Sequence, residues 1–202
     1  MKKYPEFVDF HTSSNKKDKG GESSGDEEQT APPEEIFESA YQEFRNSLTN
    51  ELLKHISENT PEFFEHLVVR LLVKMGYGGS IKDAGQSMGR SGDEGIDGII
   101  KEDKLGLDVI YIQAKRWQGS VGRPEVQKFV GALHGQRAKK DVFIATGAFT
   151  KDAELYVSTI DPKVVLIDGS RLVDLMINHN LGVSIVDAYE IKKIDSDFFF
   201  EE

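Results

Sequence analysis

Apolar residues recur at three- and four-residue spacing in two early stretches, which predicts two amphipathic helices. The second begins at Thr60, a suitable N-cap, with Pro61 at its first position, and Gly76 ends it. The first covers residues 35–58, and we expect its apolar stripe to cover the surface of the next domain, with a dimer contact as the alternative. That stripe consists of Ile36, Phe37, Ala40, Tyr41, Phe44, Leu48 and Leu52.

Beyond these helices, apolar runs and helical patterns alternate along the chain. Runs at 97–101 and 107–115, joined by a short turn, predict two paired strands. Continuous apolar character predicts two more buried strands at 142–146, in the centre of the sheet, and at 164–167. Helical crossovers allow the later strands to pair in parallel. The pattern therefore predicts an α/β three-layer fold, in which a central mixed sheet is flanked by helices. The predicted helices after the hairpin cover 123–135, 150–156 and 170–179.

Glu65 has an unusual position on the second helix. At 100° per residue it falls between Val69 and Leu72, at the edge of the apolar face. A carboxylate turned toward a core needs a cation, a metal ion or hydrogen-bond donors. Arg70 and Lys74 are alternative partners, although both lie on the other side of the helix.

The paired strands bring further polar groups to one place. A glycine-rich loop, residues 91–95, leads to Asp97 at the start of the first strand, and the second strand ends in Gln113, Ala114 and Lys115. Residues two apart share a strand face, so Gln113 and Lys115 point the same way, and pairing can bring Asp97 beside Gln113. Taken singly, Asp97 could end a turn, Gln113 could bond an edge backbone group and Lys115 could be an ordinary strand-end lysine. Their joint placement favours a site.

The oxygens in this set suit a hard divalent ion such as Mg²⁺. They are the carboxylates of Asp97 and Glu65, the side-chain carbonyl of Gln113 and the backbone carbonyl of Ala114. Such an ion polarises a phosphate and lowers the pKa of bound water. Lys115 would hold that water or offset developing charge. The pattern indicates a protein that cuts nucleic acid.

The charge distribution is compatible with this chemistry. The net charge is −10, but residues 111–140 carry seven basic side chains against the single acid Glu125, a local balance of +6. Local potential steers a phosphate backbone; the alternative is a solvated helix face. Besides Lys115, the basic residues are candidate DNA contacts: Arg116, Arg123, Lys128, Arg137, Lys139 and Lys140.

The remaining composition excludes several classes of protein. With no cysteine, the chain can form neither a disulfide framework nor a thiolate zinc site. No apolar run is long enough to span a membrane and no signal peptide is present, so we expect a cytoplasmic protein without a membrane partner. Residues 1–34 are expected to be a tail and disordered linker, the remnant of a missing N-terminal DNA-binding domain, with a docked tail as the alternative.

At the other end, residues 183–202 form an acidic and aromatic tail. We expect its three phenylalanines, residues 198–200, to dock, with an exposed peptide ligand as the alternative. The predicted organisation is thus a tail and linker, the helix at 35–58, a catalytic domain at 59–182, and this C-terminal tail.

Five segments resemble Mrr-type restriction endonucleases of the PD-(D/E)xK superfamily, and the resemblance covers about residues 35–180. They are FFEHLV (63–68), MGYGG (75–79), SGDEGIDG (91–98), IQAKRW (112–117) and FIAT (143–146). The resemblance implies a Mg²⁺-dependent enzyme, with Mn²⁺ as a substitute ion, that cleaves foreign, methylated double-stranded DNA in type IV restriction. It assigns Asp97 to the motif's aspartate, Gln113 to its second acid position, Lys115 to its lysine and Glu65 to the helical glutamate.

Two departures keep other hypotheses open. Gln113 is neutral and removes one negative charge from the metal site, and the winged-helix domain usual before the linker is missing. The alternatives are a catalytically weak or inactive DNA-binding module and an oligomerisation scaffold built on the 36–56 helix. Because double-strand cleavage usually needs two active sites, we expect a homodimer or larger assembly during cutting.

Overall fold

The computed structural model describes residues 31–78, 96–103, 107–117, 119–136, 140–161 and 163–200, with only the backbone at 134–136. Residues 1–30 of the predicted tail and linker, the glycine-rich loop at 91–95, Arg137 and Lys139 lie outside these residues, whereas Pro33 and Glu34, expected at the end of the linker, are already helical. The chain divides into two units, Met1–Ala40 and Tyr41–Glu202; in the first, the described residues are 31–40, which include the start of helix α2. No helix in the described ranges has the length and apolar character needed to cross a membrane.

Among the described residues, two helices precede the main sheet, as predicted. They are α2 (Pro33–Glu58) and α3 (Pro61–Lys74). The Thr60 hydroxyl accepts a hydrogen bond from the Phe63 amide at 3.2 Å, and Gly76 beyond the end of α3 adopts a left-handed φ of 102°. Both features agree with the prediction because an N-cap hydrogen bond and a C-terminal glycine involve only residues close in sequence.

The apolar stripe of α2 is covered toward its C-terminal end. Leu52 and Ile56 are buried in the core and Leu48 packs against it. Nearer the start of the same unit, Tyr41 and Phe44 are 49% and 78% exposed. Within Tyr41–Glu202, the expectation that the stripe covers the next domain is therefore confirmed at Leu48 and Leu52 but not at Tyr41 and Phe44. Amphipathic spacing shows which face of a helix is apolar, but it does not show how much of the helix length packs against the core.

The main sheet is mixed, as predicted. Its strands are β1 (Gly98–Lys101), β2 (Val109–Lys115), β4 (Lys140–Ala145) and β6 (Lys163–Ile167), in the order β1-β2-β4-β6. The pair β1–β2 is antiparallel, whereas β2–β4 and β4–β6 are parallel. A second, two-stranded parallel sheet, which the sequence pattern did not indicate, joins β3 (Ser120–Val121) to β5 (Ala148–Phe149).

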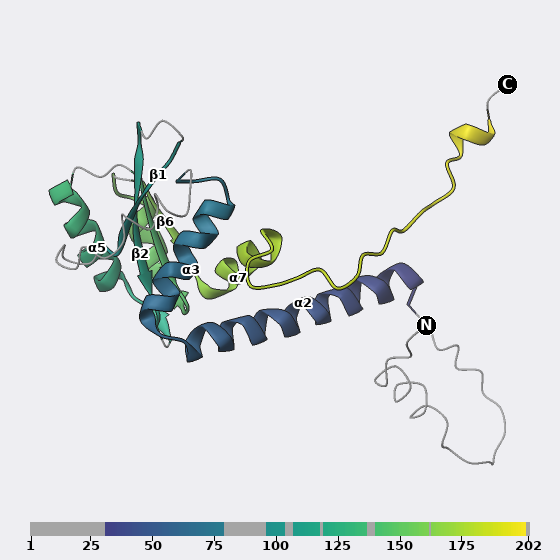
Figure 1. The fold of residues 1–202 in the computed structure, drawn as a ribbon, viewed down its shortest axis with the longest axis horizontal. Helices are drawn as coiled ribbons and strands as arrows, with labels where there is room; N and C mark the ends of the chain where they lie inside the picture. The colour runs from purple at the N-terminus through teal and green to yellow at the C-terminus, as the bar shows by residue number, and fades with distance from the viewer. Residues whose placement is uncertain are drawn as a thin grey trace, which may run out of the picture. The chain divides into compact units, whose positions relative to one another are not determined.

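Helices cover both faces of the main sheet (Figure 1). Apolar residues of α3 and α7 (Gly169–Asn178), with the end of α2, pack on one face against Ile112 and Ile144. Helices α5 (Arg123–Gln136) and α6 (Lys151–Ser158) pack on the other face against Tyr111 and Phe143. The three-layer α/β architecture is confirmed.

The strand register decides which residues meet at each end of the strands. Lys115 at the C-terminal end of β2 pairs with Ala145 at the C-terminal end of β4. Because β1 runs antiparallel to β2, Asp97, directly before β1, lies at this same end of the sheet. Lys140 begins β4 and therefore lies at the opposite end. The end that carries Asp97 and Lys115 is the predicted site.

The C-terminal tail does not dock as expected. After α7 the described chain has no regular structure until a short 3-10 turn, η1 (Asp197–Phe199). Phe198, Phe199 and Phe200 are 67%, 71% and 81% exposed, so the docking prediction was wrong. Aromatic composition does not by itself supply a surface, and the buried core is already filled by residues up to α7.

Candidate active site

Two hydrogen bonds fix Asp97 at the same end of the sheet as Lys115. Its amide donates to the Ile112 carbonyl at 2.9 Å, and its Oδ2 accepts from the Ala114 amide at 2.8 Å. Burial raises the pKa of the Asp97 carboxyl, while the Ala114 hydrogen bond and the positive charge of Lys115 oppose that rise. The prediction that strand pairing holds Asp97 beside the end of the second strand agrees with this geometry.

Glu65, on helix α3, is half-buried, and its charge interacts with that of Asp97. Burial is the largest cause that raises the pKa of Glu65, and the negative charge of Asp97 is the next. Among the described residues, Glu65 forms no ion pair with Arg70 or Lys74. Lys74 instead donates to the backbone carbonyls of His179 and Asn180 at 3.3 and 2.8 Å. The helix phase of Glu65 thus directs it toward Asp97 rather than toward the basic side of its own helix.

The donor set suits a divalent cation. Two carboxylates that repel each other in a partly desolvated place favour protonation or a bound cation. Within the described ranges no three acidic or histidine side chains gather for a metal ion, so an ion here would also need neutral oxygens. Gln113 is 8% exposed, and the Ala114 amide already points toward Asp97. Since the N–H and C=O of one strand residue face the same neighbour, the Ala114 carbonyl lies on that side too. All four groups offer hard oxygen, which suits Mg²⁺.

Lys115 is held by two neighbours. Its Nζ forms an ion pair with Glu125 Oε2, in the first turn of α5, and lies 4.9 Å from the centroid of the Trp117 ring. The hydrogen bond from Lys115 is the main cause that lowers the pKa of Glu125. Lys115 therefore shares the site with Asp97 while its ammonium group contacts α5.

The backbone around Trp117 is locked to the end of β4. Thr146 Oγ1 accepts from the Trp117 amide at 2.9 Å and donates to the Trp117 carbonyl at 3.0 Å. The Thr146 amide donates to the Lys115 carbonyl at 3.2 Å. At Gly147 a Cβ atom would come within 1.9 Å of the Gly119 carbonyl oxygen, so only glycine permits this close approach.

The candidate DNA contacts fall into two places. Arg123 and Lys128 are exposed on α5, and Arg116 is exposed just after β2. Arg123 pairs with Asp152 at 3.4 Å, and the Arg116 guanidinium donates to the Ser57 carbonyl at 3.1 Å. Arg116 directly follows Lys115, and Arg123 and Lys128 lie on α5, the helix whose Glu125 pairs with Lys115.

Lys140 does not join them. It lies at the other end of the sheet and forms ion pairs with Glu102 and, at 3.0 Å, with Asp108. Proximity in sequence suggested one basic group from 111 to 140, but strand β4 carries its first residue away from the site.

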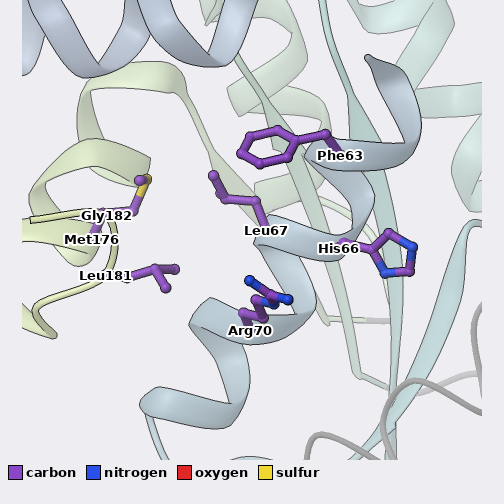
Figure 2. Close-up of a pocket in the computed structure, with 7 residues that line it drawn as sticks. All are labelled: Phe63, His66, Leu67, Arg70, Met176, Leu181 and Gly182. Carbon is purple, nitrogen blue, oxygen red and sulfur yellow. The ribbon is translucent and has the colours of Figure 1, made fainter. Parts of the chain in front are cut away.

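An apolar pocket lies away from the candidate site, between α3 and the turn that follows α7. Its volume is about 380 Å³, and Figure 2 shows Leu67 projecting toward Met176 and Leu181 while the His66 ring turns to the other side. No predicted catalytic residue lines it. The lining residues are Phe63, His66, Leu67, Arg70, Met176, Leu181 and Gly182. Phe63, near the start of α3, is 42% exposed at the rim of this pocket.

Comparison with known proteins identifies the family. A family model described as restriction endonuclease, Mrr_cat, matches residues 56–176. The chain belongs to this family. The Mrr_cat match includes Glu65, Asp97, Gln113 and Lys115, so the resemblance seen in the sequence motifs is confirmed.

The chain is also similar to one relative and, more distantly, to two solved structures. The chain is similar to the type IV methyl-directed restriction enzyme EcoKMrr of Escherichia coli (strain K12), with 45% identity over 167 residues. That alignment covers 83% of this chain and 54% of the relative, so the chain spans about half the relative's length.

The two structures are more distant. The ATP-dependent Type ISP restriction-modification enzyme LlaBIII bound to DNA matches with a TM-score of 0.42 and 21% identity, over 61% of this chain and 8% of that one. The MspJI restriction endonuclease in complex with a 27-mer oligonucleotide matches with a TM-score of 0.39 and 23% identity, over 81% of this chain and 36% of that one. The Mrr_cat assignment rests on the family model and the relative.

Glu125, Trp117 and Thr146 were not expected in the site. Glu125 entered the sequence argument only as the single acid of a basic stretch. Its contact with Lys115 depends on how α5 packs against the sheet, and no spacing rule connects residues in a strand and a following helix. The local pattern could have drawn attention to Trp117, two residues beyond Lys115, but not to Thr146.

Proposed function

We propose that this chain carries the catalytic site of a Mg²⁺-dependent endodeoxyribonuclease, acting in methylation-directed, type IV restriction of foreign DNA. The observation that supports this most directly is the meeting of Asp97, Glu65 and Lys115 at one end of the sheet in a member of the Mrr_cat family. The substrate class is taken from the name of the methyl-directed relative. The cytoplasmic location stays a prediction.

In this proposal Asp97 and Glu65 hold the ion through their carboxylates, and Gln113 and Ala114 complete its shell with neutral oxygens. The bound ion would lower the pKa of a coordinated water and polarise the scissile phosphate. Mg²⁺ is our choice because the set contains only oxygen donors, and Mn²⁺ should substitute. Because Gln113 contributes no charge, we expect the ion to bind less tightly than it would beside a third carboxylate.

Lys115 supplies the positive charge of the site. Its ammonium group would donate a hydrogen bond to the attacking water or to a phosphate oxygen, and would offset the negative charge that develops during cleavage. Asp97 accepts a hydrogen bond from the amide of Ala114, the residue directly before Lys115, so we propose that the two side chains act on one phosphate.

Arg116, Arg123 and Lys128 are proposed to contact the DNA backbone. All three are exposed. Phosphate contacts fix register and supply salt-dependent affinity but carry no sequence information. Cleavage of both strands requires two active sites, so we propose that a homodimer or larger assembly cuts double-stranded DNA.

The test is incubation of methylated and unmethylated plasmid with the purified protein, with Mg²⁺ or with EDTA. We expect cleavage of methylated plasmid with Mg²⁺ only, and loss of cleavage in Asp97→Ala and Lys115→Ala. Circular dichroism would show that both variants keep the fold. Undiminished cleavage by Lys115→Ala would overturn the assignment.

A second function is favoured by one observation: with Gln113 neutral, the described residues offer the ion two carboxylates, Asp97 and Glu65, and no cluster of three acidic or histidine side chains. A DNA-binding module with little or no cleavage would bind DNA equally well with Mg²⁺ or EDTA. It would cut neither methylated nor unmethylated duplex.

A further inference from the structure

We propose that Glu125 is a positioning residue for Lys115: its carboxylate holds the ammonium group on the α5 side of the site, so that the Asp97 and Glu65 carboxylates remain available for the metal ion. The inference rests on the proposed function because it concerns Lys115 in that reaction. Glu125 itself contacts neither the proposed metal ligands nor, in the proposal, the DNA.

The first support is the contact itself. Lys115 Nζ and Glu125 Oε2 form an ion pair between side chains that are 30% and 32% exposed. A lysine has a flexible four-carbon chain and loses much rotamer freedom when it is held in one place. A partner that is itself fixed at the start of a packed helix can hold it. Glu125 meets this condition, because the adjacent Val126 is fully buried under the sheet.

The second support is the Trp117 ring, which is the other group in contact with the Lys115 ammonium. The Trp117 ring lies under the same ammonium group, 4.9 Å away, and its backbone is bonded in both directions to Thr146. The Trp117 backbone is therefore held by Thr146, directly after β4, independently of Glu125. Lys115 sits between an aromatic face and a carboxylate, two groups that each attract a cation.

The charges around Lys115 explain why such holding is needed. Asp97 and Glu65 are the negative groups of the site, and both have pKa values raised by burial. An unrestrained ammonium group two residues from Gln113 would be drawn to these carboxylates and would occupy the place of a divalent ion. Glu125 offers it a competing carboxylate, and Lys128, the other cation acting on Glu125, stays exposed on α5.

The test uses Glu125→Gln, which keeps size and shape and removes the charge. Trp117 is the single tryptophan of the chain, so its fluorescence reports on Lys115 without metal or DNA. We expect the emission intensity or maximum to change in Glu125→Gln. In a Lys115→Met background, adding Glu125→Gln should change nothing further. The matched control is Asp174→Asn, which breaks the 3.0 Å ion pair with Arg45 on the other face of the sheet.

Cleavage kinetics give the second readout. For Glu125→Gln we expect a fall in kcat of roughly ten- to a hundredfold, as when a catalytic group is misplaced, with the KM for DNA nearly unchanged. We also expect half-maximal rate to require more Mg²⁺, whereas Asp174→Asn should match the wild type. The proposal is overturned if emission, kcat and Mg²⁺ requirement all stay at wild-type values, or if the emission change persists without Lys115.

The two proposals can fail separately. If the wild type cuts no DNA but Glu125→Gln still changes Trp117 emission in a Lys115-dependent way, Glu125 positions Lys115 and the nuclease assignment is wrong. If the wild type cuts DNA and Glu125→Gln is indistinguishable from it by emission and rate, the nuclease assignment stands and Glu125 has no positioning role.

Discussion

The carboxyl group of Asp141 should destabilise the folded protein at neutral pH but not at acid pH, and replacing it with asparagine should remove this difference. The residue lies on β4, opposite Tyr111 on β2 and Val164 on β6, and is 1% exposed. Neither oxygen of its carboxyl group has a hydrogen-bond partner among the described residues. Burial raises the pKa of Asp141 from 3.8 to about 6.

The magnitude follows from this shift. A difference of about two pKa units, at 1.36 kcal/mol per unit, corresponds to about 3 kcal/mol. Below the unfolded pKa both states hold the proton, and the group does not affect stability. Between the two pKa values the unfolded chain releases the proton while the folded chain keeps it, so stability falls as pH rises. Above the folded pKa the whole penalty of about 3 kcal/mol is present.

Asp141→Asn removes the charge with little change in shape. We expect it to raise the free energy of unfolding by about 2–3 kcal/mol at pH 8, somewhat less than the full penalty because the amide must also be buried. The gain should shrink to below about 1 kcal/mol at pH 4. Urea unfolding at both pH values measures this, and Asp161→Asn, an exposed acid, should stay within about 0.5 kcal/mol of wild type at both. A loss of stability at pH 8, or an equal gain at both pH values, would refute the reasoning.

Three further predictions concern the site and the tail. At a Mg²⁺ concentration ten times its Kd, thermal unfolding should show a gain of about 1.4 kcal/mol that EDTA or Asp97→Asn removes; an unchanged Tm would argue against the ion site. In salt titrations of DNA binding, Arg123→Ala or Lys128→Ala should reduce the slope of log K against log salt by roughly one phosphate contact, and Lys140→Ala should leave it unchanged. Replacing the exposed residues Phe198–Phe200 by serine should change the free energy of unfolding by less than about 0.5 kcal/mol; a larger loss would show that the tail docks in solution.

Local features of the fold followed the sequence closely. Thr60 caps α3 as predicted, and Thr150 caps the helix expected from residue 150; each hydroxyl accepts a hydrogen bond from the amide three residues on, at 3.2 and 3.3 Å. The hairpin β1–β2 and the central place of β4 also agree with the pattern of apolar runs. Strands β3 and β5 were missed, since two-residue strands carry no period that a sequence can show.

The sequence alone indicated four members of the candidate site: Glu65, Asp97, Gln113 and Lys115. The two-residue spacing along β2 places Gln113 and Lys115 on the same face of the strand. The neighbouring strand begins directly after Asp97. Helical phase places Glu65 away from the basic side of its helix. Each of these relations depends on residues within one or two elements, where the strand or helix period fixes direction.

Only the tertiary structure decided the neighbours of these residues. The packing of α5 brought Glu125 to Lys115, the pairing of β4 with β2 separated Lys140 from the other basic residues, and the same pairing buried Asp141 without a described partner. These contacts join positions that no local period relates. They form because burying the apolar faces of the sheet and helices fixes where every attached polar group must lie.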